Sequence, residues 1–570
     1  MPTATSMTLE QALDLLDGSF NEFATAVTQD RYAFWLGSGI SRERVPPLRG
    51  VAIKVIAYLQ SRISLHDPNC RFGVTLEEVL RLVGFSDEDR RRNDIRQPIA
   101  SWPDRDNIAD RLTLQYSRML DVPVLGEGPD FLLWEAVDVV RTYADPTLEP
   151  DSEHLCLAGL IAEGVASTIV SANWDGLIEK ALLQLTGTVA SMNVCVRPEE
   201  TRRVPSRSIL YKPHGCAVLA GENAGLYRAM LVARKSQIDR FITDIGNPIV
   251  QRLIDIATSK QSLIVGLSVQ DGNLQGIFAT AQQRMHWPFP SQPPAIIIAG
   301  SEIGPDQESL LQNVYLAQYS GATRQAIQQS SIFTAYAKLF FLSLFVHVLS
   351  AKLTALMEIA VCGWAAVSRD QLRTGVRLLQ TKLAQSGLSG DYRNLTSMVL
   401  GYCARTLCLF REGSEPNAGS PSYRAITNTP AHQLVQDPML PATGLPGLGL
   451  AFALLGLGES RGHWEIHEPD MADLRPGVLR ITASGSTAQV FLASDAESVS
   501  NLIGEGLLDS TDPAILIHSR RMEPPMARSP KGVYGRSGGP TMREISLGAL
   551  LGASADVDEL LERFREEVAA

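Results

Sequence analysis

Four short segments of this 570-residue chain carry polar side chains directly after apolar runs, and each could contribute to a nucleotide site. They are Gly37–Ser41, Ser171–Gly176, Lys212–Gly215 and Gly266–Asp271. Glycine lets the backbone approach a diphosphate closely, while amide, carboxylate and imidazole groups can orient a water molecule and take up its proton. These residue types therefore indicate chemistry on a nucleotide.

The first segment, GSGIS (residues 37–41), follows the apolar run Tyr32–Leu36, which we interpret as a buried strand. A strand that leads through a glycine turn into a helix is typical of the opening of a nucleotide-binding α/β unit. The free amides at the start of that helix would then bind the diphosphate. As a dinucleotide fingerprint the segment is incomplete, because Arg42 stands where a third glycine is expected. An ordinary strand-to-helix turn is therefore the alternative.

Asn173 and Asp175 lie just after the second apolar run, STIVS (167–171). Ligands of open α/β sheets bind at the carboxyl ends of the strands, where these two side chains are expected. The amide of Asn173 could orient a water molecule or a ribose hydroxyl, and Asp175 offers a hydrogen-bond acceptor. The alternative is that both residues only cap the next helix, since Asn and Asp are common N-caps.

His214 follows a third apolar run, SILY (208–211), and histidine is the side chain best suited to proton transfer near neutral pH. A purely structural histidine is the alternative. Gly266, Ser268 and Asp271 belong to the segment at the end of a fourth run, SLIVG (262–266). That segment could hold a second ribose or phosphate, or it could be a simple capped loop.

The elements that must position these side chains alternate along the chain. Residues 8–29 place apolar side chains every three or four positions, which predicts an amphipathic helix, and residues 51–150 are mostly helical in pattern. A further strand is predicted at AIIIA (295–299). Short buried strands separated by helices predict an α/β fold with a Rossmann-like, mostly parallel sheet and a helical insertion. All four segments can then lie along one edge of the sheet.

Beyond this region the pattern changes. Four parts are predicted: an α/β nucleotide-binding domain over residues 1–325, an apolar helical region over 326–412, a Gly-, Pro- and Ser-rich linker over 413–446, and a C-terminal α+β module over 447–570 for a partner or assembly.

Composition limits the classes of function. The net charge of −11 argues against a general polyanion binder, so nucleic acid is expected at most through a partner. The seven cysteines are scattered and form no C-x-x-C pair, which argues against a zinc module and predicts a reducing, cytoplasmic compartment. The start lacks a secretory pattern, and the most apolar stretch, Leu339–Ala351, is too short to span a membrane. No metal site is predicted.

In order and residue type, the four segments resemble the SIR2 (sirtuin) family of NAD-consuming enzymes. GSGIS (37–41) resembles the family's G-A-G-I-S phosphate loop, and NWD (173–175) resembles its N-I-D catalytic segment. HG (214–215) resembles the catalytic His-Gly, and GLS (266–268) the G-T-S ribose loop. The resemblance covers about residues 20–300 and implies a SIR2-like domain that takes NAD as its substrate.

The sequence also departs from the deacylating members of that family. Their zinc module with two C-x-x-C pairs is absent, so no zinc is expected. Their cofactor loop G-I-P-D-F-R is matched at Pro47, but Leu48, Arg49 and Gly50 stand where Asp, Phe and Arg are expected. Loss of the aromatic that shields the activated sugar would admit water and favour hydrolysis. The chain is more similar to the SIR2-domain NADases of bacterial antiphage defence, which join SIR2 to a sensing or assembly region.

This resemblance implies an NAD⁺ glycohydrolase that cleaves the nicotinamide–ribose bond and depletes cellular NAD⁺ once a partner or assembly step activates it. It implies as partners a second copy of the chain, and a HerA-like motor ATPase, an Argonaute-like protein or a phage trigger, with no membrane. An NAD-dependent protein deacylase and a non-catalytic NAD or ADP-ribose sensor are the alternatives. The presence of both Asn173 and His214 argues against the sensor.

The resemblance also implies a role for each candidate residue. Asn173 would position the attacking water, His214 would accept a proton, and Asp175 would orient the nicotinamide side. The residues expected to bind NAD are Gly37, Ser38, Gly39, Ile40, Ser41, Pro47, Gly266, Ser268 and Asp271.

Overall fold

A seven-stranded sheet forms the centre of the α/β part, and all of its strand pairs are parallel. The strands are β1 (Tyr32–Leu36), β2 (Thr168–Ser171), β3 (Met192–Cys195), β4 (Ser208–Tyr211), β5 (Gln261–Val265), β6 (Ala295–Ala299) and β7 (Ile332–Thr334). Their order is β3-β4-β2-β1-β5-β6-β7, so the chain crosses from one side of β1 to the other between β4 and β5. The predicted Rossmann-like parallel sheet is confirmed.

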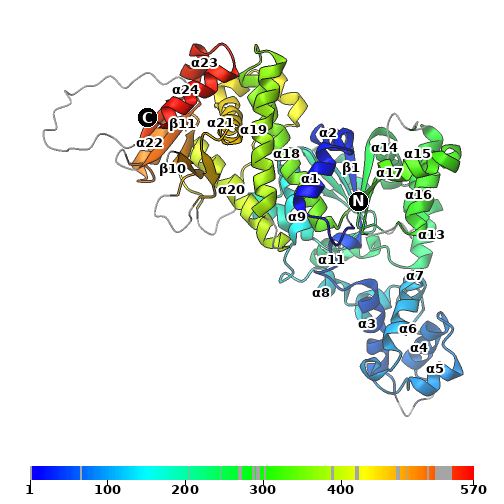
Figure 1. Cartoon of the computed structure of the whole chain (residues 1–570). Helices are drawn as coiled ribbons and strands as arrows, with labels where there is room; N and C mark the ends of the chain where they lie inside the picture. Colours follow the sequence, from blue (N-terminus) through cyan, green and yellow to red (C-terminus); the bar gives the residue numbers. More distant parts are fainter. Residues whose placement is uncertain are drawn as a thin grey trace.

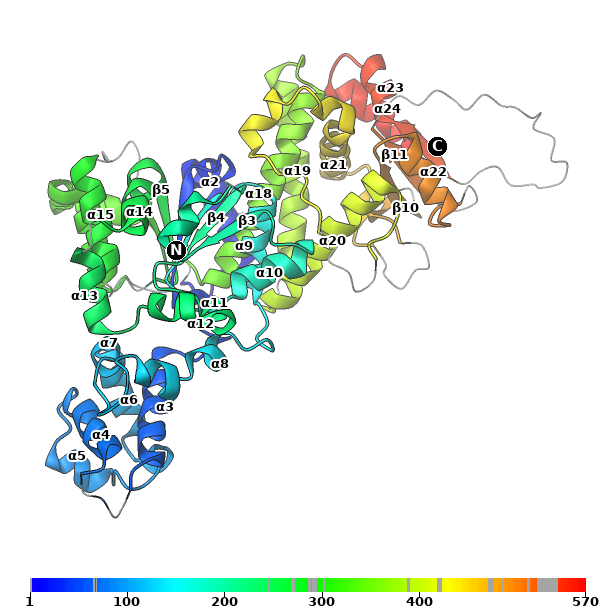
Figure 2. The same ribbon diagram turned by 180° about the vertical axis from the view of Figure 1, so that it is seen from behind.

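The structure is a computed structural model, and Figures 1 and 2 show a helical lobe, the sheet with its covering helices, and a third body formed by later helices and a second sheet. It describes residues 3–64, 67, 69–204, 206–243, 246–267, 272–285, 289, 295–300, 303–386, 390–417, 423–469, 476–483, 485–509, 513–519 and 542–569.

Both faces of the large sheet are buried, because successive side chains of a strand point to opposite sides. In β1, Tyr32 and Phe34 pack into one helical layer, while Ala33 and Trp35 pack into the other. The first layer includes α1 (Leu9–Asp17), α2 (Asn21–Thr28), α9 (Ser152–Ala162), α10 (Leu177–Thr186) and α18 (Ala337–Ala360). The second includes α14 (Pro248–Ser259), α15 (Gly272–Arg284), α16 (Pro305–Tyr315) and α17 (Gly321–Ser331).

The structure differs from the sequence predictions at several elements. The helix predicted over residues 8–29 is two helices, because α1 ends at Gly18, whose amide donates to the Leu15 carbonyl. Strands β3 and β7 were not predicted, and β7 extends the sheet beyond residue 325. Both are sheet-edge strands of only four and three residues, so each leaves a weak pattern in the sequence.

The helical insertion between β1 and β2 folds around a hydrophobic core of its own. Its helices are α3 (Leu48–Ser61), α4 (Arg71–Arg81), α5 (Asp87–Arg92), α6 (Arg105–Thr113), α7 (Tyr116–Met119) and α8 (Val139–Tyr143). The same core receives side chains from α11 (Ala217–Glu222) and from Tyr227 at the end of α12 (Ala224–Tyr227). The insertion therefore packs against the loops that follow β2 and β4, while most of it lies away from the sheet (Figure 1).

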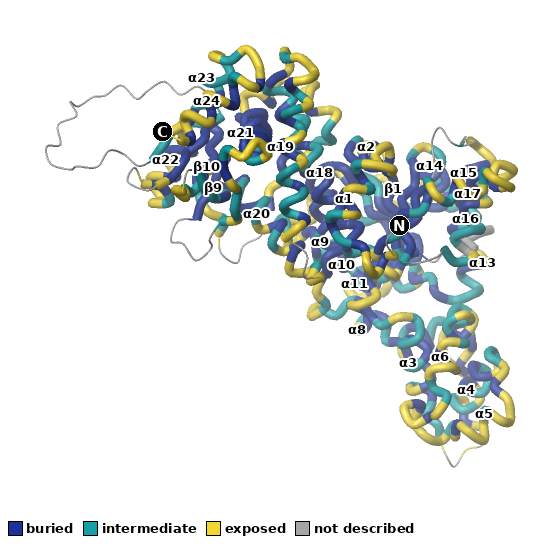
Figure 3. The backbone as a smooth tube through the Cα atoms, viewed as in Figure 1, coloured by how far each residue is buried: buried dark blue, intermediate teal, exposed yellow. Residues whose placement is uncertain are grey.

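The C-terminal part is joined to the α/β part by one continuous core, which runs through α18 into the second sheet. The later helices are α19 (Ala366–Ser386), α20 (Tyr392–Glu412), α21 (Leu445–Ser460), α22 (Ala496–Gly504), α23 (Leu547–Ala553) and α24 (Val557–Ala569). The second sheet is mixed, with the order β12-β11-β10-β9-β8. Its strands are β8 (Glu465–His467), β9 (Leu479–Ala483), β10 (Ser486–Ala493), β11 (Ala514–His518) and β12 (Arg543–Ser546). Figure 3 shows β1 and α21 among the buried segments.

The segment expected to be a linker, residues 413–446, contributes buried side chains to this core, among them Tyr423, Ile426 and Leu434. The apolar stretch that begins at Leu339 is part of α18, which has 24 residues. By length and composition α18 could cross a membrane, but 67% of its most apolar window is buried inside the protein. Its apolar character is thus explained by its contacts with α9 and α21.

Candidate nucleotide-binding site

The four polar segments begin at the carboxyl ends of four adjacent strands, β4, β2, β1 and β5, and so lie along one edge of the sheet. Hydrogen bonds join neighbouring segments: Ala217 N–H to the Trp174 carbonyl (2.8 Å), Asn173 Nδ2 to the Gly37 carbonyl (3.1 Å), and Gly39 N–H to the Gly266 carbonyl (2.8 Å). The edge is therefore one connected surface, at the place where ligands bind in open α/β sheets.

The loops after β1 and β5 touch through their backbones at Gly39 and Gly266. A Cβ atom on Gly39 would lie 2.5 Å from Gly266 Cα, and one on Gly266 would lie 2.7 Å from the Ile40 nitrogen. Gly266 also has a φ of +66°, which L side chains rarely adopt. Glycine is therefore required at both positions, and Gly37 meets the same neighbour, with a Cβ 2.5 Å from the Gly266 carbonyl oxygen.

The helix expected directly after the glycine turn is not there, and that prediction was wrong. Ser38–Ile40 form a single 3₁₀ turn, and the next α-helix, α3, starts only at Leu48. Prolines at positions 46 and 47 lack the amide hydrogen that an earlier helical turn would use, and Pro47 caps α3 from an exposed position. Within the turn, the amides of Gly39 and Ile40 donate to the Gly266 and Gly37 carbonyls, while Ser38 is exposed.

The side chain of Asn173 is held between the glycine loop and Ser41. Its Nδ2 donates to the Gly37 carbonyl at 3.1 Å and to Ser41 Oγ at 3.2 Å. A carbonyl can only accept, so this contact fixes which end of the amide is nitrogen. Among the described residues no donor reaches Asn173 Oδ1, and the side chain is 8% exposed. The amide therefore presents its oxygen as an acceptor for a ligand.

Behind Ser41 lies His154, which the sequence analysis did not single out. Ser41 is fully buried, and its Oγ lies 3.2 Å from His154 Nε2. The Asp151 amide donates to His154 Nδ1 at 3.2 Å. Burial lowers the pKa of His154 to about 4, although the carboxylates of Asp175 and Asp151 oppose this, so the ring is neutral near neutral pH. In the sequence, the D-x-x-H spacing at the start of α9 indicates the contact between Asp151 and His154, but not the one between His154 and Ser41.

Asp151 anchors a charged group at the start of α9. Its carboxylate pairs with Arg44 and, at 3.1 Å, with Lys338. Burial opposes its ionisation, yet the Ser152 amide and these two cations together hold the pKa of Asp151 below its usual value. The group therefore fixes the first turn of α9, and with it His154, against the loop that follows β1.

Asp175 is buried and precedes Gly176, which is the N-cap of α10. Its Oδ1 accepts from the Leu177 amide at 3.2 Å. Its backbone carbonyl accepts a 2.5 Å hydrogen bond from Lys212, which is fully buried. Lys212 also pairs with Glu179 at 2.6 Å. Burial opposes the charge of this ammonium group, but Cys216, Glu179 and Asp175 raise the pKa of Lys212 overall. A fixed positive charge thus lies under the loops that carry Asp175 and His214.

His214 is 8% exposed and lies on the loop after β4, the strand next to β2. The following Gly215 has a φ of +91°, and a Cβ there would lie 2.6 Å from the Met230 carbonyl oxygen. The His214 carbonyl accepts from the Val232 amide at 3.0 Å. These contacts hold the His214 loop at the same sheet edge as Asn173. Ser268 and Asp271 lie outside the described residues.

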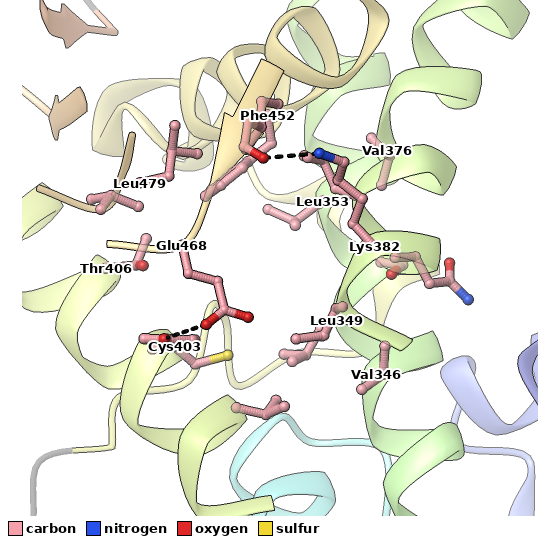
Figure 4. Close-up of a pocket in the computed structure, with 18 of the residues that line it drawn as sticks. Val346, Leu349, Leu353, Val376, Lys382, Cys403, Thr406, Phe452, Glu468 and Leu479 are labelled. Carbon is pink, nitrogen blue, oxygen red and sulfur yellow. Dashed lines mark hydrogen bonds between the residues drawn. The ribbon is translucent and has the colours of Figure 1, made fainter. Parts of the chain in front are cut away.

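An apolar cavity of about 290 Å³ lies elsewhere, among α18–α21 and the second sheet. Figure 4 shows aliphatic side chains such as Leu349, Leu353 and Val376 around it, and Glu468 is also among the lining residues. Within the described part of the chain, no group of three or more His, Cys, Asp or Glu side chains could hold a metal ion.

Comparison with protein families supports the resemblance seen in the sequence. Residues 167–320 match the family model of the SIR2-like domain. No curated protein matches this chain. The matched range contains Asn173, Asp175, His214 and Gly266, while the glycine loop after β1 precedes it and is hydrogen-bonded to it. The α/β part thus contains a SIR2-like domain at residues 167–320, which suggests NAD-related chemistry.

Proposed function

We propose that the protein hydrolyses NAD⁺ at the nicotinamide–ribose bond. The observation that carries the proposal is the amide of Asn173, which is locked by Gly37 and Ser41 with its oxygen left as an acceptor at the edge of the sheet. His214 follows the adjacent strand and supplies an imidazole that would accept a proton during the reaction. The SIR2-like domain makes NAD the expected substrate.

The reaction consumes one water molecule and releases nicotinamide, ADP-ribose and a proton. The C–N bond breaks with its electron pair passing to the nicotinamide nitrogen, through an oxocarbenium-like state comparable to that of glycoside cleavage. The new C–O bond forms from water held by Asn173 Oδ1, and His214 accepts the proton from that water or from a ribose hydroxyl. The diphosphate would bind at the exposed turn of Ser38 and Gly39, and Asp175 would orient the nicotinamide side.

Hydrolysis is favoured over deacylation by the residues that follow the glycine loop. Pro47 is the N-cap of α3, and Leu48, Arg49 and Gly50 form the first turn of that helix. They therefore do not form a flexible loop with an aromatic side chain that could exclude water from the sugar. The chain also lacks the paired C-x-x-C motifs of a zinc module. An NAD-dependent deacylase remains the enzyme alternative and would require an acylated peptide for turnover.

The proposal includes control of the activity by assembly or by a partner. The continuous core from the first helical layer through α18 to the second sheet would let an event on the C-terminal module reach the site. We place this function among the cytoplasmic antiphage effectors that deplete NAD⁺, with further copies of the chain, a motor ATPase, an Argonaute-like protein or a phage trigger as the activating species. An NAD or ADP-ribose sensor that binds without cleaving is the non-enzymatic alternative.

Nicotinamide and ADP-ribose release from NAD⁺ tests the proposal. Purified protein is assayed alone and with candidate activators, beside Asn173→Ala and His214→Ala. Loss of a proton-transfer group costs about 10²–10⁴-fold in rate, so the His214→Ala rate should fall in that range, and Asn173→Ala should fall at least as far.

The matched controls are Asn193→Ala, on the edge strand β3, and His432→Ala, at an exposed position. Both should hydrolyse NAD⁺ at the wild-type rate. Turnover that depends on an acylated peptide would instead identify a deacylase. NAD⁺ binding without nicotinamide release under every activator would contradict hydrolysis and identify a sensor.

A further inference from the structure

Three buried side chains form a chain of hydrogen bonds that ends at the ligand-facing amide. His154 contacts Ser41 Oγ through Nε2, and Asn173 Nδ2 donates to the same oxygen; both distances are 3.2 Å. His154 and Ser41 are fully buried, while Asn173 is 8% exposed. We call His154, Ser41 and Asn173 the His154 relay.

The direction of each hydrogen bond in the relay follows from its neighbours. The Asp151 amide can only donate, so His154 Nδ1 must accept. In a neutral imidazole the other nitrogen then carries the hydrogen, so Nε2–H donates to Ser41 Oγ. Ser41 Oγ thus accepts one hydrogen bond from His154 and one from Asn173, so both of its lone pairs are used.

We infer that His154 is a positioning residue, which acts through Ser41 to keep the oxygen of the Asn173 amide directed at the substrate. Without His154, the Ser41 hydroxyl can rotate and turn its own hydrogen toward Asn173 Nδ2, which cannot accept it. The amide would then lose one of the two contacts that fix its orientation. The inference rests on the proposed function for its effect on catalysis, but the orientation of the amide can be measured without turnover.

The first test is therefore spectroscopic and uses the full chain labelled with ¹⁵N-asparagine. The side-chain amide signals that disappear in Asn173→Ala are assigned to Asn173. In the wild type they should exchange slowly with solvent, because the amide donates to two buried acceptors. His154→Phe removes both hydrogen bonds of the ring and should shift these signals and speed their exchange at least 10-fold. His432→Phe, at an exposed position, should leave them unchanged.

The second test is a double-mutant cycle on NAD⁺ hydrolysis. His154→Phe and Ser41→Ala should each lower kcat about 10- to 100-fold with little change in KM. The kcat of the double variant should be no lower than that of the less active single variant. A merely structural role of His154 would instead multiply the two losses. His154→Gln, which keeps one acceptor and one donor, should retain most of the wild-type rate. If His154→Phe does not fold, His154→Leu, which also removes both hydrogen bonds of the ring, replaces it in both tests.

The outcomes separate this inference from the proposed function. Unchanged Asn173 signals in His154→Phe, or multiplicative losses in the cycle, would overturn the relay while leaving hydrolysis intact. Shifted signals in a protein that binds NAD⁺ without cleaving it would contradict the hydrolase and support the relay.

Discussion

The two ends of α9 hold two buried polar clusters of different kinds. At its start, the His154 relay consists of uncharged groups and leaves Asn173 Oδ1 as an acceptor at the sheet edge. Directly after its end, Glu163 and Lys352 form an ion pair at 2.7 Å, with both side chains fully buried. We call the first the open cluster, because Asn173 Oδ1 has no donor among the described residues, and the second the closed cluster.

The closed cluster uses every hydrogen-bonding group it has. Lys352 Nζ contacts the Glu163 carbonyl and carboxylate and both oxygens of Thr427, at 2.6–3.0 Å. The other carboxylate oxygen of Glu163 accepts from the Tyr423 hydroxyl and the Ile426 amide. Burial lowers the pKa of Lys352, while Glu163 opposes that shift. These contacts hold the end of α9 to α18 and to residues 423–427.

The largest effect is expected when the closed cluster loses one partner. Lys352→Met leaves the Glu163 carboxylate buried beside apolar atoms and should lower the free energy of unfolding by about 3–5 kcal/mol, measured by urea denaturation. Adding Glu163→Gln to this variant removes the uncompensated charge and should recover part of the loss. A decrease below about 1 kcal/mol for Lys352→Met would mean that the cluster does not anchor α9.

A smaller and pH-dependent effect is expected at the open end, from Glu153. This side chain is buried in the first turn of α9, and its Oε2 has no hydrogen-bond partner among the described residues. Burial raises the pKa of Glu153 to about 8. The folded state therefore keeps a proton that the unfolded state loses above its usual pKa of 4.5, so this group destabilises the fold as pH rises toward 8.

Glu153→Gln removes that dependence. The free energy of unfolding of Glu153→Gln minus that of the wild type should grow by about 2–3 kcal/mol between pH 5 and pH 7. Each pH unit in this range contributes about 1.36 kcal/mol. His154 has the opposite effect on stability. Because its pKa is lowered from 6.5 to about 4 in the folded state, the free energy of unfolding rises with pH over that range. The comparison of Glu153→Gln with the wild type cancels that contribution. A difference that does not change with pH would contradict a protonated Glu153.

Most of the central sheet could be predicted from the sequence alone. Five strands of the large sheet were predicted within a residue of their bounds, because each is a short run of apolar side chains followed by a polar turn. β3 was missed because Asn193 interrupts its apolar pattern and the strand lies at the edge of the sheet. The burial of Tyr423 and Ile426 was also missed, since these side chains stand among Gly, Pro and Ser, which are typical of a linker.

The candidate site was only partly predictable for a similar reason. Asn173 and His214 follow predicted strands, so the order of the parallel sheet brings their loops to one edge. His154 comes from the start of a helix in the covering layer, and nothing in its spacing relates it to residue 41. Only the packing of α9 over the sheet brings the imidazole to Ser41. Contacts between layers of this kind depend on side-chain packing and not on a local pattern.

The smallest effect is expected at an exposed ion pair, which provides the reference for the closed cluster. Lys180 pairs with Glu149 at 2.7 Å, the same distance as the Glu163–Lys352 pair, but its side chains are 28% and 49% exposed. Water already stabilises each of these charges, so Glu149→Gln should lower the free energy of unfolding by less than about 1 kcal/mol in the same urea assay. The Lys180 hydrogen bond lowers the pKa of Glu149, so this small contribution should vanish as pH falls through that pKa. An effect as large as that of Lys352→Met would mean that burial does not explain the difference between the two pairs.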